Sequence, residues 1–380
     1  MAKTQYYYIQ RKKAESGQTG TATYDLPDSG IIPELVLVAY STPTASTDPA
    51  LPLNKAITKV EIVDGATVIK SLTGNQIMGL YLNTECNEFA STEINDNAVE
   101  GHETFHIPLG RKIDGVNYAP DFSKFQNPQI KISWDYSQTT GPFGATFDAD
   151  TDPSMKFTVM AKIVRDTNKY TPGYIKSNQI KTWTSSASTE VKTVLPKDRP
   201  LVGIMVEAGY DDKNWTDDIN EIKLSFNNGE WEPIHLYADD IVPWVQSITD
   251  KPKKVSFNMD LKDAVEIDSH MGYLVHITGT GASSAGRSFE FDDSHKGVEA
   301  VGYMDVSTPA AISTYEQVRI EAIGYLPYQC FYIPASSITD GESDIIDTTR
   351  FDRADFYCTS GANCSTSSTP AIVTEYLIIQ

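Results

Sequence analysis

A spacing of apolar residues occurs twice in the chain, and this duplication constrains the fold more than any other feature of the sequence. The first block runs from Ile57 to Leu80 and the second from Ile219 to Trp244. In both blocks, apolar residues at positions i, i+3 and i+5 are followed by a glycine turn, another apolar residue and a short apolar cluster. Each block therefore predicts a strand, a hairpin, a second strand and a short helix or turn. A chain of 380 residues can hold two copies of a domain of roughly 150 to 180 residues. A chance similarity between two β-rich segments stays open as the alternative.

The rest of the chain has the periodicity of β-strands. Runs rich in β-branched and aromatic residues, several of which alternate apolar with polar, occur at Leu35–Tyr40, Gln129–Trp134, Phe157–Val164 and Gln317–Ile323. Asp-Gly and Asn-Gly turn signals separate runs of this kind. Helical candidates are few and short, namely Thr73–Leu80, Ala238–Ile248 and Ser343–Phe356. The pattern predicts an all-β protein built from sandwiches.

A segment rich in Ser, Thr and Pro lies between the two copies. It contains a Thr-Pro-Gly turn and a Ser/Thr-rich run, which are typical of linkers and loops. We therefore expect four parts in the chain. They are an N-terminal arm at 1–20, a first sandwich at 21–170, a linker with loop excursions at 171–199, and a second sandwich with a C-terminal tail at 200–380.

The chain is acidic as a whole, but its first residues are basic. With 51 acidic and 31 basic residues its net charge is −20, so we expect no sequence-specific nucleic-acid partner. The first thirteen residues carry a charge of +4, and their basic and aromatic side chains are Lys3, Tyr6, Tyr7, Tyr8, Arg11, Lys12 and Lys13. Such side chains suit a wet anionic interface. We expect this arm to face a lipid membrane or, alternatively, nucleic acid, and an ordinary solubilised terminus is the remaining interpretation.

Three short motifs resemble known sites, but each lacks either a required residue or the required secondary structure. His102–His106 reads H-E-x-x-H, which binds zinc only on a helix. Gly101 and Pro108 flank it and favour a strand, in which the two imidazoles lie about 13 Å apart. Gly281–Ser288 resembles a phosphate-binding loop, but a strand-like run follows it instead of a helix. Asp148–Asp152 begins like a calcium loop and then lacks the required Gly and Glu. We therefore predict no catalytic, cofactor or metal site, and no enzyme activity.

Three features together carry a resemblance to a known family. They are the duplicated block, the run Phe105-His106-Ile107-Pro108-Leu109-Gly110-Arg111 with Asp114, and the stretch from Ile346 to Asp355 with the final apolar run Ala371–Ile379. In these features the chain resembles the double jelly-roll major capsid proteins of tailless icosahedral viruses, which include bacteriophages.

The resemblance implies two tandem eight-stranded jelly rolls with few short helices, and no enzyme activity. It also implies a homotrimer that forms a pseudo-hexagonal capsomer, with neighbouring capsomers and a vertex (penton) protein as partners. The protein would be made in the host cytoplasm and reside in the virion, with its basic arm facing an internal membrane or the genome. Two other classes stay open. One is a phage receptor-binding or carbohydrate-binding β-sandwich protein with an exposed aromatic platform. The other is a sandwich hydrolase or lyase with converging carboxylates.

Overall fold

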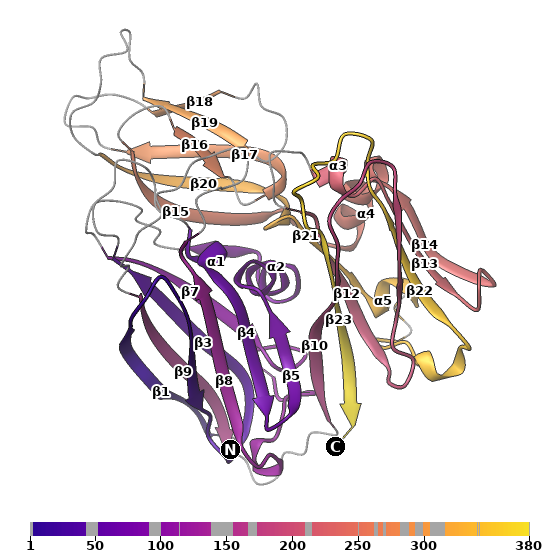
Figure 1. Ribbon diagram of the computed structural model, residues 1–380, viewed down its shortest axis with the longest axis horizontal. Coiled ribbons are helices and arrows are strands. Elements are labelled where there is room, and N and C mark those ends of the chain that lie inside the picture. The colour runs from indigo at the N-terminus through magenta and orange to yellow at the C-terminus, as the bar shows by residue number, and fades with distance from the viewer. Residues whose placement is uncertain are drawn as a thin grey trace.

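The computed structural model describes residues 3–42, 52–90, 100–113, 115–137, 155–165, 173–209, 215–249, 251–261, 265–268, 271–281, 289–292, 299–304, 316–339, 341 and 343–379. Two β-sandwiches stand side by side, and a third group of strands lies at one end of them (Figure 1). The N- and C-termini lie together at the opposite end (Figure 1).

The first sandwich is built from the N-terminal half of the chain. Its strands in chain order are β1 (Lys3–Glu15), β2 (Thr19–Asp25), β3 (Ile31–Ser41), β4 (Ile57–Asp64), β5 (Thr67–Leu72), β7 (Gly101–Pro108), β8 (Pro128–Asp135) and β9 (Met155–Arg165). One sheet has the order β1-β9-β3-β7 and the other has the order β2-β8-β4-β5. Counted along the sandwich, these are strands 1-8-3-6 and 2-7-4-5, and all neighbours are antiparallel. This arrangement is a jelly roll, and we call it the first roll.

The second sandwich repeats this strand order. Its strands are β10 (Gly173–Thr182), β11 (Glu190–Val194), β12 (Leu201–Glu207), β13 (Glu221–Phe226), β14 (Trp231–Tyr237), β21 (Cys330–Pro334), β22 (Ala354–Thr359) and β23 (Ala371–Ile379). The orders β10-β23-β12-β21 and β11-β22-β13-β14 are again 1-8-3-6 and 2-7-4-5, with antiparallel neighbours. The predicted fold class, two tandem eight-stranded jelly rolls, is therefore confirmed.

The second roll carries a large insertion between its fifth and sixth strands, residues 253–327. The strands are β15 (Lys253–Leu261), β16 (Val265–Asp268), β17 (Met271–Gly281), β18 (Phe289–Asp292), β19 (Glu299–Met304) and β20 (Glu316–Pro327). They form the sheets β17-β20-β15-β6 and β16-β19-β18, where β6 (Glu88–Ala90) comes from the first roll and runs parallel to β15. The insertion thus lies over the end of the first roll, although it belongs to the second roll in sequence (Figure 1).

Short helices complete the fold. They are α1 (Leu53–Ala56), α2 (Gly74–Thr84), α3 (Trp215–Asp218), α4 (Ala238–Ile248), α5 (Ala335–Ile338), and the 3-10 turns η1 (Phe122–Lys124) and η3 (Thr348–Arg350). The two duplicated blocks become β4-β5-α2 and β13-β14-α4, as predicted. The helix α2 begins with a capping box, because Thr73 and Gln76 exchange side-chain to backbone hydrogen bonds, each of 3.1 Å.

Each roll has its own core between its two sheets. Phe105, Phe157 and Leu37 are fully buried in the first, and Phe226 and Phe356 in the second. The first core continues into the insertion, where further apolar residues join it: Val255, Phe257, Ile320 and Ala322. Apolar burial therefore holds the insertion against the first roll.

The structure differs from three sequence-based predictions. The predicted arm at 1–20 is not free, because Lys3–Glu15 forms β1 and pairs along its length with β9. The predicted linker at 171–199 contains β10 and β11, the first two strands of the second roll. A helix over Ser343–Phe356 is wrong. Asp347 caps the turn η3 there, and Phe356 lies in β22 between β11 and β13.

Candidate functional site: the joint between the rolls and the free sheet edges

The two rolls are joined edge to edge by a short parallel strand pair. Lys70 and Ser71 of β5, the fifth strand of the first roll, pair with Ser177 and Asn178 of β10, the first strand of the second roll. This pair merges one sheet of each roll into a single eight-stranded sheet. The joint therefore uses main-chain hydrogen bonding at a sheet edge, which is directional and fixes the register.

A partly buried polar cluster secures the joint beside α2. Asn75 Nδ2 donates to Glu207 Oε1 at 2.7 Å, and Gln76 Nε2 donates to Glu207 Oε2 at 2.8 Å. Gln76 Nε2 also donates to Gln179 Oε1 at 2.6 Å. Burial raises the pKa of the Glu207 carboxyl, and the hydrogen bonds from Asn75 and Gln76 act against that rise. The helix of one roll is thus tied to two strands of the other.

A second polar cluster surrounds Glu375 on β23. Its Oε1 accepts from Ser177 Oγ at 2.6 Å and lies 4.0 Å from Lys70 Nζ, while its Oε2 accepts from Tyr332 Oη at 2.9 Å. Gly203 on β12 leaves the space that the Tyr332 side chain occupies, because a Cβ at Gly203 would overlap the Tyr332 ring. Burial lowers the pKa of Lys70, and the charge of Glu375 opposes that change. Both rolls therefore contribute to one desolvated cluster, whose groups are costly to separate from each other.

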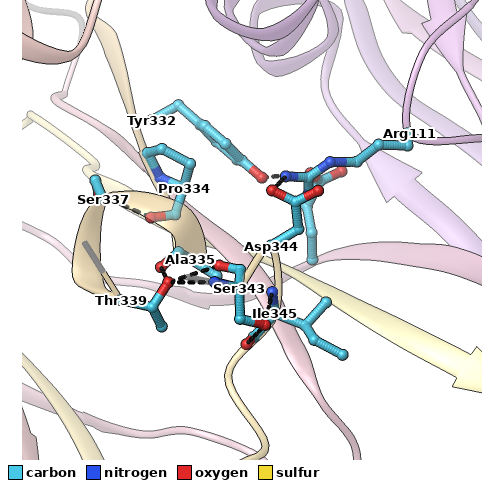
Figure 2. Close-up of polar contacts among 10 residues, drawn as sticks. Arg111, Tyr332, Pro334, Ala335, Ser337, Thr339, Ser343, Asp344 and Ile345 are labelled. Carbon is cyan, nitrogen blue, oxygen red and sulfur yellow. Dashed lines mark hydrogen bonds and ion pairs between the residues drawn. The ribbon is translucent and has the colours of Figure 1, made fainter. Parts of the chain in front are cut away.

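An ion pair closes the joint at its rim. Arg111, which follows β7 in the first roll, places Nη2 at 3.3 Å from Asp344 Oδ1 in the second roll. Figure 2 shows Arg111 directed toward Asp344 and the Tyr332 hydroxyl. The Asp344 loop is held by Thr339, whose Oγ1 donates to the Ser343 carbonyl at 2.6 Å (Figure 2). With Asp344 largely exposed, this pair adds orientation more than stability.

Within the described residues, the equivalents of the two joint strands in the opposite rolls lie at open sheet edges. β1 is the first strand of the first roll, and β14 is the fifth strand of the second roll. Their exposed aromatic side chains are Tyr6 (56% exposed), Tyr7 (49%), Tyr8 (56%), Trp231 (36%) and Tyr237 (54%). These are five of the nine large hydrophobic side chains that are exposed in the described part of the chain, so exposed aromatic surface gathers at these two edges.

All seven residues predicted for the arm lie on β1. Lys12 forms an ion pair with Glu100, and Lys13 Nζ lies 2.8 Å from Glu15 Oε1. The Lys12 ammonium also lies 4.7 Å from the centre of the Tyr40 ring, and the Arg11 guanidinium 6.0 Å from that of Tyr8. The structure places the basic and aromatic side chains together on one edge strand, which is held in place by its pairing with β9. Their contact with a membrane or with the genome stays a prediction.

The H-E-x-x-H motif lies on a strand, as its flanking Gly and Pro predicted. His102 and His106 lie on the strand β7, where the H-E-x-x-H zinc geometry cannot form. His106 Nδ1 lies 2.6 Å from Glu34 Oε1, and its ring stacks on Tyr81 at 4.7 Å. Among the described residues, no three His, Cys, Asp or Glu side chains gather as metal ligands. The Asp148–Asp152 motif and all but the first residue of Gly281–Ser288 lie outside the described residues.

No local pattern in the sequence identifies the polar residues of the joint as a group, although one repeated motif marks Tyr332. The sixth strand of each roll ends with the same pattern, Phe105-His106-Ile107-Pro108 and Phe331-Tyr332-Ile333-Pro334. In both, the Phe and Ile side chains are buried, and the residue between them makes a polar contact on the other face. This second repeat could have located Tyr332 as a counterpart of His106.

Comparison with known proteins supports the fold. No family model matches the chain, and no curated protein matches it. Among solved structures, the chain is similar to the STIV MCP, with 11% identity, 99% of this chain and 97% of that chain covered, and a TM-score of 0.57. A chain from the structure of Sulfolobus turreted icosahedral virus gives the same identity and TM-score, with 99% and 90% covered. The major capsid protein P2 from bacteriophage PM2 has 9% identity, 100% and 98% covered, and a TM-score of 0.51. The chain therefore has the fold of the double jelly-roll major capsid proteins. No helix in the described ranges is long and apolar enough to span a membrane.

Proposed function

We propose that this chain is the major capsid subunit of a tailless icosahedral virus, and that three copies form a pseudo-hexagonal capsomer. The observation that carries the proposal is the fixed joint between two rolls of identical strand order. Three such chains supply six similar rolls, which can surround a centre with sixfold-like spacing while obeying threefold symmetry. The similarity over nearly the whole length of two chains called major capsid proteins supports this role.

Further partners follow from this role. The subunit would be made in the host cytoplasm and enter the virion, where neighbouring capsomers and a vertex protein would contact its trimers. Interfaces in such permanent assemblies bury roughly 2,000 Å² or more. We expect the trimer to be the form that the isolated protein adopts.

We propose a structural role without catalysis. The carboxylates of the joint, the half-buried Glu207 and the buried Glu375, accept hydrogen bonds from neighbouring side chains, which suits them to fixing the rolls relative to each other. A carbohydrate-binding sandwich would need an aromatic platform across a sheet face. In the described residues, most exposed aromatic side chains instead follow the edges β1 and β14, which favours the capsid role over that alternative.

Electron microscopy of the purified protein and of its source particle tests the proposal. We expect isolated molecules with a hexagonal outline and threefold symmetry, and the same outline tiling the particle shell. Light scattering at micromolar concentration should give the mass of three chains. A monomer in solution together with a particle shell built from another protein would refute the proposal.

A further inference from the structure

The two strand edges that form the joint within the chain have equivalents elsewhere in the molecule that are not paired among the described residues. Each roll has an edge at its first strand and an edge at its fifth strand. The joint uses the fifth-strand edge of the first roll, β5, and the first-strand edge of the second roll, β10. The complementary pair, β1 and β14, has no strand partner on its outer side among the described residues, and the two strands lie at opposite sides of the molecule (Figure 1). One chain therefore carries both halves of a second joint but cannot close it alone.

The register of this second joint can be derived from rows of paired residues. In the first roll, one row across strands 1-8-3-6 reads Tyr6, Lys162, Glu34, Pro108. In the second roll, the corresponding row reads Ser177, Glu375, Gly203, Pro334. Both rows end at the Pro of the repeated Phe-x-Ile-Pro pattern. Tyr6 therefore occupies the position of Ser177, and Tyr7 that of Asn178.

The fifth strands align in the same way. Lys70 of β5 pairs with Ile62 of β4, and Ile234 of β14 pairs with Leu224 of β13. Ile62 and Leu224 are equivalent positions of the duplicated block. Ile234 thus corresponds to Lys70, and the next residue of β14, His235, corresponds to Ser71.

We propose that β1 of one copy pairs in parallel with β14 of a second copy, with Tyr6 opposite Ile234 and Tyr7 opposite His235. This inference rests on the trimer of the proposed function and names the surfaces that build it. The contact joins two different edges, so it is heterologous, and three copies close it into a ring of six rolls. Every joint in the ring then follows one pattern, alternately within a chain and between chains.

The charges at the two edges are complementary in this register. Continuing in parallel, the residue four positions beyond Tyr7 is Arg11, and the residue four positions beyond His235 is Asp239. Lys12 and Lys13 follow Arg11, and Asp240 follows Asp239 at the exposed start of α4. Bulges interrupt β1 between Tyr8 and Lys13. The basic side chains would therefore lie close to Asp239 and Asp240 without being paired with them by main-chain hydrogen bonds. Opposite charges would favour this approach and disfavour β1–β1 contacts between copies.

A designed disulfide tests the register. Residues opposite each other in neighbouring strands lie within the Cα distance that a disulfide spans. We expect the double variant Tyr7→Cys/His235→Cys to give reductant-sensitive covalent dimers and trimers under mild oxidation, at least tenfold more than the control Tyr7→Cys/Glu190→Cys. Glu190 is an exposed residue on β11, at the other edge of the sheet that contains β14, so it is a matched control. The single variants show any background from the native thiols.

A charge exchange gives a second measure that needs no new thiol. Arg11→Glu should weaken the trimer in light scattering by at least tenfold in dissociation constant, and Arg11→Glu/Asp239→Arg should restore it. A stable trimer that gives no more disulfide than the control would overturn this inference and leave the capsid role intact. A monomer in every sample would overturn both. Flotation of the trimer with anionic vesicles that is lost in Arg11→Glu, without the disulfide, would assign β1 to a membrane instead.

Discussion

Replacing Tyr332 by Phe measures how strongly the buried polar groups hold the two rolls together. The change removes only the hydroxyl that donates to Glu375 Oε2 at 2.9 Å, and the ring keeps the space that Gly203 provides. A hydrogen bond to a charged group contributes about 1.5–3 kcal/mol, because the acceptor would otherwise be buried without its donor. We therefore expect the free energy of unfolding to fall by about 2 kcal/mol. With an unfolding entropy of about 0.8 kcal/mol/K for 380 residues, Tm should fall by about 2–3 °C.

Urea denaturation and calorimetry of the variant and the parent provide the measurement. The control is Tyr273→Phe, the same substitution at a half-exposed tyrosine of the insertion, which should change stability by less than about 0.5 kcal/mol. A double-mutant cycle with Glu375→Gln should give a coupling energy of about 1–2 kcal/mol. If Tyr332→Phe is no more destabilising than the control, the hydroxyl does not secure the joint and the reasoning is wrong.

Three further predictions concern close packing, thiols and zinc. Gly79→Ala should destabilise the protein by about 1–2 kcal/mol in urea, although Ala is the better helix former, because the new Cβ would lie 2.6 Å from Cys330 Cβ and Sγ; a more stable variant would contradict this. A thiol reagent should modify the native protein first at Cys86 and Cys364, which are partly exposed, because the reagent cannot reach the buried Cys330 and Cys358, where burial also raises the thiol pKa far above its usual range; equal reaction at all four would contradict it. His106→Ala should leave the zinc content of the purified protein unchanged in elemental analysis, and loss of stoichiometric zinc would show that the strand argument is wrong.

The sequence predicted those elements in which local pattern and tertiary burial agree. The helix Ala238–Ile248 matches the prediction residue for residue, and the predicted helix Thr73–Leu80 lies within the capped turn and helix that run from Thr73 to Thr84. The strands of the duplicated block follow their apolar spacing because one face of each strand enters a core. In these segments the local spacing of apolar residues is enough to identify the type of element and the face that is buried.

The sequence did not predict edge strands or long-range polar contacts. β1 lies at an edge, and its described side chains are exposed except for the partly buried Ile9, Gln10 and Glu15, so it lacks the apolar alternation that identifies a half-buried strand. The bonds from Asn75 and Gln76 to Glu207 join residues 132 and 131 positions apart, and no local pattern encodes such a pair. Ser343–Phe356 has an apparent helical spacing of apolar residues but does not form a helix, because Phe356 lies in the strand β22 and is buried in the second core.

The insertion between β14 and β21 has a practical consequence for imaging. Only the second roll carries it, and it stands at the end of the molecule away from both termini (Figure 1). In a ring of three copies, six rolls of the same strand order would look alike at low resolution after a rotation of 60°, which makes particle images hard to align. Three protruding insertions would break that ambiguity, so the true rotation could be assigned even at a resolution too low to separate strands. A label inserted there would serve the same purpose without touching β1, β14 or the joint.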